Sequence, residues 1–299
     1  MKKYIIASLV IALWACESKK GPSKEDFEEN LEEMTESTFD VSDENITNIL
    51  NSIPSPLEIS FIIHDTGIEY DKAILNSENN VSKYNSNNQK AINLGVYGTD
   101  LGYTDIYEQN QHGLLYLSVI KDLADDLGIG QFFDFQLIRD LTENSKNLDS
   151  LLLVTNDNFN RINDHFQEQN RSSLSSMLLF GGWVESLHLT CQVTLQNIES
   201  EDLVERIGEQ KIILENMMIL LDAYGAQDAY IKELGVKAAA LQKAFDDVEI
   251  TYTYEESTSK IVDGVLVIQN NSSSSVNITP EKVKEIADLT AELRNEITG

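Results

Sequence analysis

Between Asn87 and Asp247 the sequence consists of long segments in which apolar residues recur at helical spacing. Short breaks, such as LGIG at 127–130 and the glycine at 225, separate these segments. Apolar residues three or four positions apart share one face of a helix, and that face must pack against another element. The pattern therefore predicts a mainly α protein that forms an irregular multi-helix bundle.

The breaks also give approximate helix boundaries. We expect two helices before residue 67, one from Ser42 and one after Pro54, and only short helical pieces in the Asn- and Ser-rich region 70–88. The longer helices are expected at 87–106, 111–127, 132–144, 147–169, 172–196, 201–224 and 226–247. The segment NDNFNRIND at 156–164 resembles a calcium loop only in its Asn and Asp content, and we expect it to be helical.

The pattern changes after residue 247. The stretches VEITYTYEE and KIVDGVLVIQN are rich in β-forming residues, and we expect them to pair as a small β-hairpin near 248–270, across a loop at 255–260. The following NNSSSSVN is expected to be a loop. A final amphipathic helix should begin with Thr279 as its cap and Pro280 at its first position.

The N-terminus reads as a targeting segment. Lys2 and Lys3 precede a nearly unbroken apolar run over 4–15. This run is too short to cross a membrane as a helix, which needs about 20 residues, but it fits the central region of a signal peptide. The sequence Leu13-Trp14-Ala15-Cys16 then resembles the lipobox of bacterial lipoprotein precursors, with Trp14 departing from the small residue usual at that place.

That resemblance implies cleavage before Cys16, whose sulfur would carry a diacylglyceryl group and whose amine would be acylated. Two or more acyl chains hold a protein stably on a membrane, at about 0.8 kcal/mol for each buried methylene. Glu17 follows the cysteine, and the absence of an aspartate there suggests the outer membrane. Whether the protein would face the periplasm or the cell exterior stays open.

The chain is strongly acidic, with 50 Asp and Glu against 22 Lys and Arg, a net charge of −28. Removing residues 1–15 takes away two lysines, so the mature charge is −28 − 2 = −30. Such a surface repels nucleic-acid phosphates, which argues against nucleic-acid binding. We expect a signal peptide at 1–15, an acidic tether at 16–45 and a single helical domain at 46–299.

Only two cysteines are present, so lipidation of Cys16 leaves Cys191 without an intramolecular partner. Cys191 lies among apolar residues in LHLTCQVTL, where a buried, unreactive thiol is favoured over a nucleophile. The domain must therefore be stabilised by burial, which a body of about 250 residues can provide.

The segment LGVYGTDLGY places three glycines on one stripe of its predicted helix, at 95, 98 and 102. Each glycine costs about 0.8–1 kcal/mol relative to alanine in a helix, so a compensating role is expected. One role is close packing of a neighbouring helix, which is favoured. The alternative is the floor of a ligand groove, with Tyr97, Asp100 and Tyr103 beside it.

The segment FGGWVESLH is the second distinctive stretch, with two adjacent glycines followed by Trp183. Glu185 and His188 form a Glu-x-x-His pair, which ferritin-like di-iron bundles use. That architecture needs a second such pair, and none is present. We therefore expect a hydrogen-bonded pair rather than a metal site, and predict neither metal nor cofactor.

Basic residues are scarce, which draws attention to Arg139 and Arg171. A buried arginine would pair with an acid such as Asp100 or Glu185. A pocket arginine that binds a carboxylate ligand is the alternative. The sequence has no nucleophile elbow, phosphate loop or zinc motif, so an enzyme is disfavoured but not excluded.

Through LGVYGTDLGY and GGWVESLH the body resembles uncharacterised helical lipoproteins of Gram-negative bacteria, a resemblance that implies no activity. Our hypothesis is a lipid-anchored binding or scaffold protein of the cell envelope. A helical groove would take an envelope protein, a peptide or a small ligand, with Tyr97, Asp100, Tyr103, Arg139, Arg171, Trp183 and Glu185 as candidate binding residues. The alternatives are a metal-dependent enzyme of ferritin-like type and a purely structural envelope component.

Overall fold

The computed structural model describes residue 49 and residues 67–143, 148–253, 258–262, 265–269 and 273–299. All of them belong to the compact unit Asp43–Gly299. This part of the chain is mainly helical and ends in a small β region and a final helix, so the predicted fold class is confirmed. The predicted signal peptide, Cys16 and the tether lie outside the described residues, as do the predicted helices before residue 67 apart from the helical, buried Ile49.

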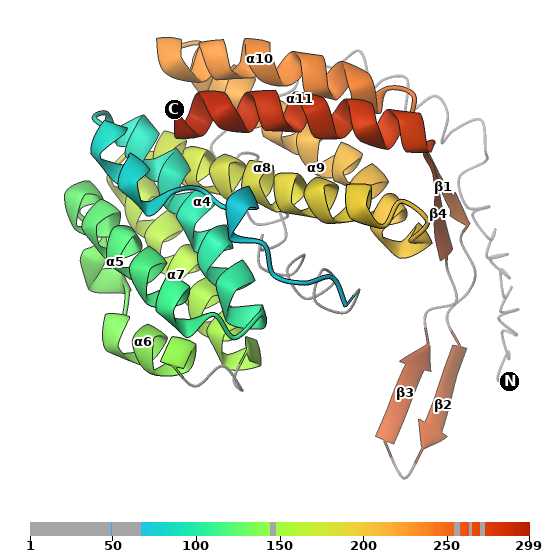
Figure 1. Cartoon of the computed structure of the whole chain (residues 1–299), viewed down its shortest axis with the longest axis horizontal. Helices are drawn as coiled ribbons and strands as arrows, with labels where there is room; N and C mark the ends of the chain where they lie inside the picture. The colour runs from blue at the N-terminus through green and yellow to red at the C-terminus, as the bar shows by residue number, and fades with distance from the viewer. Residues whose placement is uncertain (1–48, 50–66, 144–147, 254–257, 263–264, 270–272) are drawn as a thin grey trace, which may run out of the picture. The chain divides into compact units, whose positions relative to one another are not determined.

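The predicted helices between 87 and 247 are all present, with small shifts at their ends (Figure 1). The α-helices are α4 (Asn87–Ile106), α5 (Asn110–Leu127), α6 (Phe135–Glu143), α7 (Leu148–Glu168), α8 (Ser172–Gln196), α9 (Glu201–Gly225), α10 (Ala229–Phe245) and α11 (Pro280–Thr298). Short 3-10 turns form η1 (Lys72–Ile74), η2 (Glu78–Lys83) and η3 (Gly130–Phe132). The segment 156–164 lies inside α7, as expected.

Local sequence signals explain several of these ends. The Ser86 side chain accepts a hydrogen bond from the Gln89 backbone N–H, and the Gln89 side chain accepts one from the Ser86 N–H, so a capping box begins α4. Gly128 ends α5 in the left-handed conformation, at φ 76°, which glycine adopts without a steric penalty. Thr279 caps α11 and Pro280 is its first residue, as predicted.

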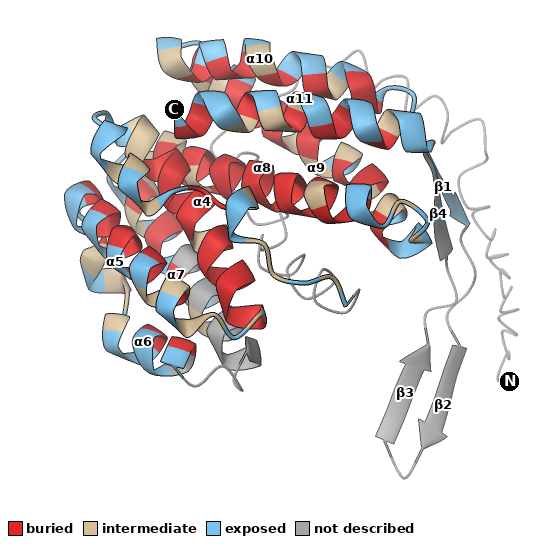
Figure 2. Ribbon diagram, in the orientation of Figure 1, coloured by how far each residue is buried: buried red, intermediate tan, exposed pale blue. Residues whose placement is uncertain are grey.

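Helix α8 is the centre of the core. It contacts α4, α7, α9 and α11, and nearly all of its residues from Leu174 to Thr194 are buried. Figure 2 shows α4 and α8 buried on almost every side, whereas α10 and α11 bury one face each. Cys191 on α8 is fully buried, and burial raises the pKa of its thiol, as expected for an unreactive cysteine.

The predicted strand pairing was wrong. Strand β1 (Glu249–Thr253) pairs antiparallel with β4 (Ser273–Asn277), a stretch expected to be a loop. Strand β2 (Thr258–Val262) pairs antiparallel with β3 (Val265–Gln269); β3 and the last three residues of β2 lie within KIVDGVLVIQN, and β2 begins inside the expected loop at 255–260. Two residues, Asp-Gly, separate β2 from β3 in the sequence, and that dipeptide is a strong signal for a two-residue hairpin connection. The hairpin therefore forms inside the second β-rich stretch instead of between the two.

Candidate functional site

Glycines on α4 and α8 allow the two helices to meet backbone to backbone. A Cβ atom added to Gly95 would lie 2.0 Å from the Leu178 carbonyl oxygen, and one added to Gly181 would lie 1.9 Å from the Ile92 carbonyl oxygen. The Thr99 hydroxyl is within 3.2 Å of the Gly182 carbonyl oxygen, which bridges the same interface. At these positions the packing alternative is correct, and the predicted groove floor is wrong because the facing helix fills it.

The three glycines of α4 do not act as one stripe. A Cβ atom added to Gly98 would meet nothing within 4 Å, whereas Gly95 is in tight contact with α8. Gly102 is buried near the C-terminal end of the helix. Helical spacing put the three glycines on one face, but α8 covers that face closely at Gly95 and not at Gly98.

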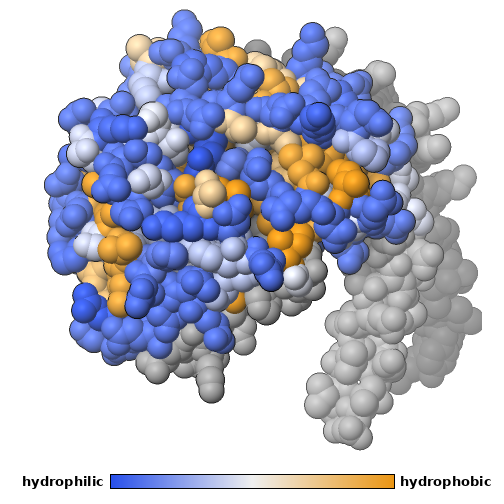
Figure 3. Space-filling view, in the orientation of Figure 1, coloured by the Kyte–Doolittle hydropathy of each residue, from blue (hydrophilic) through white to orange (hydrophobic). Residues whose placement is uncertain are grey.

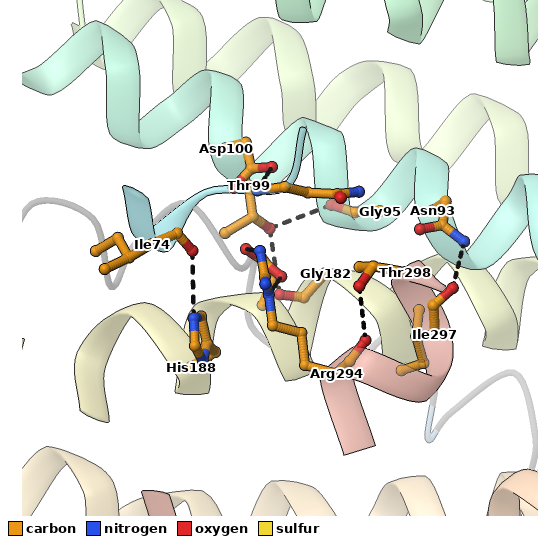
Figure 4. Close-up of polar contacts among 12 residues, drawn as sticks. Ile74, Asn93, Gly95, Thr99, Asp100, Gly182, His188, Arg294, Ile297 and Thr298 are labelled. Carbon is orange, nitrogen blue, oxygen red and sulfur yellow. Dashed lines mark hydrogen bonds and ion pairs between the residues drawn. The ribbon is translucent and has the colours of Figure 1, made fainter. Parts of the chain in front are cut away.

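A buried ion pair joins α8 to α11 beside this contact (Figure 4). The Arg294 Nε and Nη2 atoms donate to the two carboxylate oxygens of Glu185, at 2.7 and 2.8 Å. The Glu185 side chain is fully buried, and that of Arg294 is 11% exposed. Although burial by itself lowers the pKa of Arg294, the Glu185 charge and these hydrogen bonds raise it above its ordinary value. Two parallel charge-assisted bonds fix the geometry and neutralise both charges.

Asp100 on α4 adds a second buried carboxyl to this pair. Its Oδ2 atom accepts a hydrogen bond from the Asn76 backbone N–H at 3.1 Å, and no described residue hydrogen-bonds its buried Oδ1 atom. Burial, and then the Glu185 charge, raise the pKa of Asp100 well above its ordinary value, and Arg294 only partly opposes them. One guanidinium can balance one carboxylate, so the site favours a protonated, neutral Asp100.

His188, one helical turn after Glu185, points toward residues 70–84. Its Nε2 atom lies 3.2 Å from the Ile74 carbonyl oxygen. A carbonyl can only accept, so Nε2 must carry the proton in this arrangement. Burial lowers the pKa of His188, which leaves the ring neutral and its Nδ1 atom a bare acceptor. Nδ1 is buried and has no hydrogen-bond partner among the described residues.

The segment Tyr70–Tyr84, which we call the strap, lies against these groups. Tyr97 and Tyr116 donate to the Ser77 and Asn76 carbonyl oxygens, at 2.7 and 2.9 Å. The Asp71 backbone N–H donates to the Tyr103 hydroxyl at 3.3 Å. We call the five helix residues that bond the strap main chain the polar site: Tyr97, Asp100, Tyr103, Tyr116 and His188. Burial raises the pKa of all three tyrosines, so their hydroxyls stay protonated.

The structure brings together only some of the predicted binding residues. Tyr97, Asp100, Tyr103 and Glu185 belong to the polar site or its charged neighbours. Trp183 is buried elsewhere on α8, where its indole N–H donates to the Gln210 side chain at 3.1 Å. It therefore has a packing role between α8 and α9.

Neither Arg139 nor Arg171 is buried, so the pairing expected of a buried arginine does not arise at either position. Arg139 is exposed on α6, and Arg171 precedes α8 with its guanidinium 5.1 Å from the Phe166 ring and 3.3 Å from the Leu127 carbonyl oxygen. Neither pairs with Asp100 or Glu185, because Arg294 takes that place. The sequence held a weak signal for Arg294, a scarce basic residue next to the apolar face of α11. Asn76 lies in a polar stretch and gave no signal at all.

Both members of the Glu-x-x-His pair have other partners in the structure. Glu185 is held by Arg294, and His188 donates to a main-chain carbonyl. In the described ranges no three His, Cys, Asp or Glu side chains are placed to hold a metal ion. Among the helices that the structure describes, none is both long and apolar enough to cross a membrane.

Comparison with known proteins gives no relative: no family model, no curated protein and no solved structure matches this chain. The contacts of its own side chains therefore carry the functional argument.

A further buried acid, Asp105, gives a prediction for stability. Burial raises its pKa from 3.8 to about 7, and only the Thr142 hydroxyl, at 3.4 Å, partly offsets this. Because the pKa of Asp105 is higher in the folded than in the unfolded protein, the proton bound to its carboxyl stabilises the fold. This stabilisation is fully present below pH 3.8 and is lost as pH rises through 7. We expect Asp105→Asn to raise the free energy of unfolding at pH 8 by up to about 4 kcal/mol, the equivalent of about three pKa units.

Urea unfolding at pH 8 and pH 4 checks this expectation. The gain of Asp105→Asn over the wild type should shrink toward zero at pH 4, because the wild-type carboxyl is then protonated in the folded protein. Asp222→Asn, at an exposed position, should show no such trend. An equal gain at both pH values would mean that Asp105 is ionised in the fold at pH 4 as well.

Proposed function

We propose that this protein is a lipid-anchored binding or scaffold protein of the cell envelope, attached to the outer membrane through Cys16. The short apolar run, the lipobox-like LWAC and the acidic stretch that follows support the anchor. Two or more acyl chains would hold the mature N-terminus in the bilayer. The mature charge of −30 (−28 − 2) would keep the helical domain away from anionic headgroups.

One observation carries the preference for binding over catalysis: the two oxygens of Glu185 are both taken by Arg294. The pair that a ferritin-like enzyme would use for metal is thus committed to holding α8 and α11 together. A domain whose core is held together in this way can present a fixed surface to a binding partner. The face in Figure 3 is mostly hydrophilic, with hydrophobic residues in separate areas, which fits a water-facing body.

Cell fractionation of a Cys16→Ser variant tests the anchor. We expect the wild type in the membrane fraction and most of the variant in the soluble fraction, because serine cannot form the thioether. Mass spectrometry of the wild-type N-terminal peptide should find an acylated Cys16 and no residues 1–15. Circular dichroism of both proteins controls for folding.

Scaffolding or binding is tested separately, by cross-linking in intact cells. The wild type should give defined cross-linked species that disappear in the Cys16→Ser strain, because anchoring brings the partner within reach. In the fractionation experiment, retention of folded Cys16→Ser protein in the membrane fraction would contradict the proposed anchor. Identical cross-linked species from both proteins would contradict a role that depends on anchoring.

A further inference from the structure

The hydrogen bonds between the polar site and the strap join side chains of the helices to main-chain atoms of the strap. Side chains of the helices reach main-chain atoms of the strap at four positions: Asp71, Ile74, Asn76 and Ser77. Asn76 is held at both its N–H, by Asp100, and its carbonyl oxygen, by Tyr116. Hydrogen bonds to main-chain atoms can hold a peptide segment whatever its sequence, and some peptide-binding proteins hold their ligands in this way.

The strap is less buried than the helices that it covers. Only Leu75, Asn76 and Tyr84 are buried; Tyr70, Ile74 and Val81 are partly buried against the core, and its other residues are exposed or intermediate. Its hydrogen-bonded helical turns are the short η1 and η2. Segments with few buried apolar contacts open locally more easily than the core that they cover.

The polar site is built mainly by the helices. The Tyr97 and Tyr116 rings, from α4 and α5, pack with centroids 5.9 Å apart, and both residues are buried. Glu185 and Arg294 fix the charges beside Asp100 (Figure 4). One buried acceptor, His188 Nδ1, receives no hydrogen bond from any described residue. The strap thus leaves hydrogen-bonding capacity unused.

From these contacts we propose that the polar site is a peptide-binding site that the strap occupies in the resting protein, and that a peptide segment from a partner displaces it. The peptide would repeat the main-chain bonds made at Asp71–Ser77. A side-chain donor on the peptide, such as an amide or a hydroxyl, would reach the unused acceptor His188 Nδ1. This inference rests on the proposed binding function and names the class of its ligand.

Hydrogen exchange of the full-length Cys16→Ser protein tests whether the strap opens by itself. The reporter is the Asn76 amide, which donates to Asp100. We expect it to exchange faster than the core amides of α8, and its rate should not change in Leu234→Ala, which weakens the buried core on α10. Exchange of Asn76 only together with α8, and equally accelerated by Leu234→Ala, would overturn the proposal.

Binding of a fluorescent peptide with the sequence of residues 70–80 tests displacement. Leu75→Ala weakens the strap and leaves the polar site intact, so the peptide should bind this variant at least about 30-fold more tightly than the wild type, the factor expected from losing a buried leucine. Leu234→Ala is the matched control, since its leucine is similarly buried but lies on α10, and it should bind as the wild type does.

Adding Tyr116→Phe to Leu75→Ala should change peptide binding little, because the strap and the peptide that replaces it lose the same hydrogen bond. No gain in Leu75→Ala, or the same gain in Leu234→Ala, would overturn the proposal. If Leu75→Ala does not fold, the hydrogen-exchange result on the other proteins still decides. These assays use protein without the anchor, so a negative result would not bear on the anchoring proposal. A negative result in the fractionation experiment would likewise not bear on the peptide-binding proposal.

Discussion

Gly95→Ala will destabilise the protein even though alanine is the better helix former. The added Cβ would lie 2.0 Å from the Leu178 carbonyl oxygen and 2.7 Å from the Gly182 nitrogen, both backbone atoms that cannot rotate away. Helices α4 and α8 must therefore separate, which loosens the most extensive helix contact in the described core. We expect a loss of about 3 kcal/mol, the upper part of the usual range for overpacking.

Gly98→Ala is the matched control, three residues along the same helix. Its Cβ would meet nothing within 4 Å, so the substitution should stabilise α4 by about 0.8–1 kcal/mol through helix propensity alone. Thermal and urea unfolding of the two variants should thus shift in opposite directions. Equal stability of Gly95→Ala and the wild type would mean that α4 and α8 do not approach as closely as the structure has them.

Arg294→Met should have the second large effect. It leaves the Glu185 carboxylate buried without a counter-charge, next to a second buried carboxyl, Asp100. Removing one partner of a buried ion pair costs about 3–5 kcal/mol. For a domain of this size that corresponds to a fall of roughly 10 °C in the unfolding temperature.

The double variant Glu185→Gln/Arg294→Met should recover a large part of this loss, because no unpaired charge remains buried. Arg161→Met is the control, since Arg161 is 52% exposed and its ion pair with Asp157 is on the surface. It should change stability by less than about 1 kcal/mol. If the double variant is as unstable as Arg294→Met, the cost comes from lost packing and not from the uncompensated charge.

The sequence alone predicted the helices well because their signals are local. Apolar spacing, the glycine after Leu127 and the Thr279-Pro280 start each act within one or two turns of the chain. The same kind of local signal favours the β2–β3 hairpin, in the Asp-Gly between Val262 and Val265, over a connection at 255–260.

The candidate site was predicted only in part. Burial of Tyr97, Asp100 and Glu185 follows from their places in apolar helices, and their need for polar partners could be foreseen. The identity of those partners could not be predicted from the sequence. Glu185 is 109 residues from Arg294, and Asp100 is 24 residues from the Asn76 amide that it accepts from.

The sequence by itself determined that this chain forms helices, which of their faces are apolar, and that an acidic body follows a lipobox-like N-terminus. Only the tertiary structure decided that Gly95 packs while Gly98 does not, that Arg294 neutralises Glu185, and that the strap covers the polar site. The physical reason is that spacing along a helix sets which residues share a face, whereas the neighbour of that face depends on how distant helices pack.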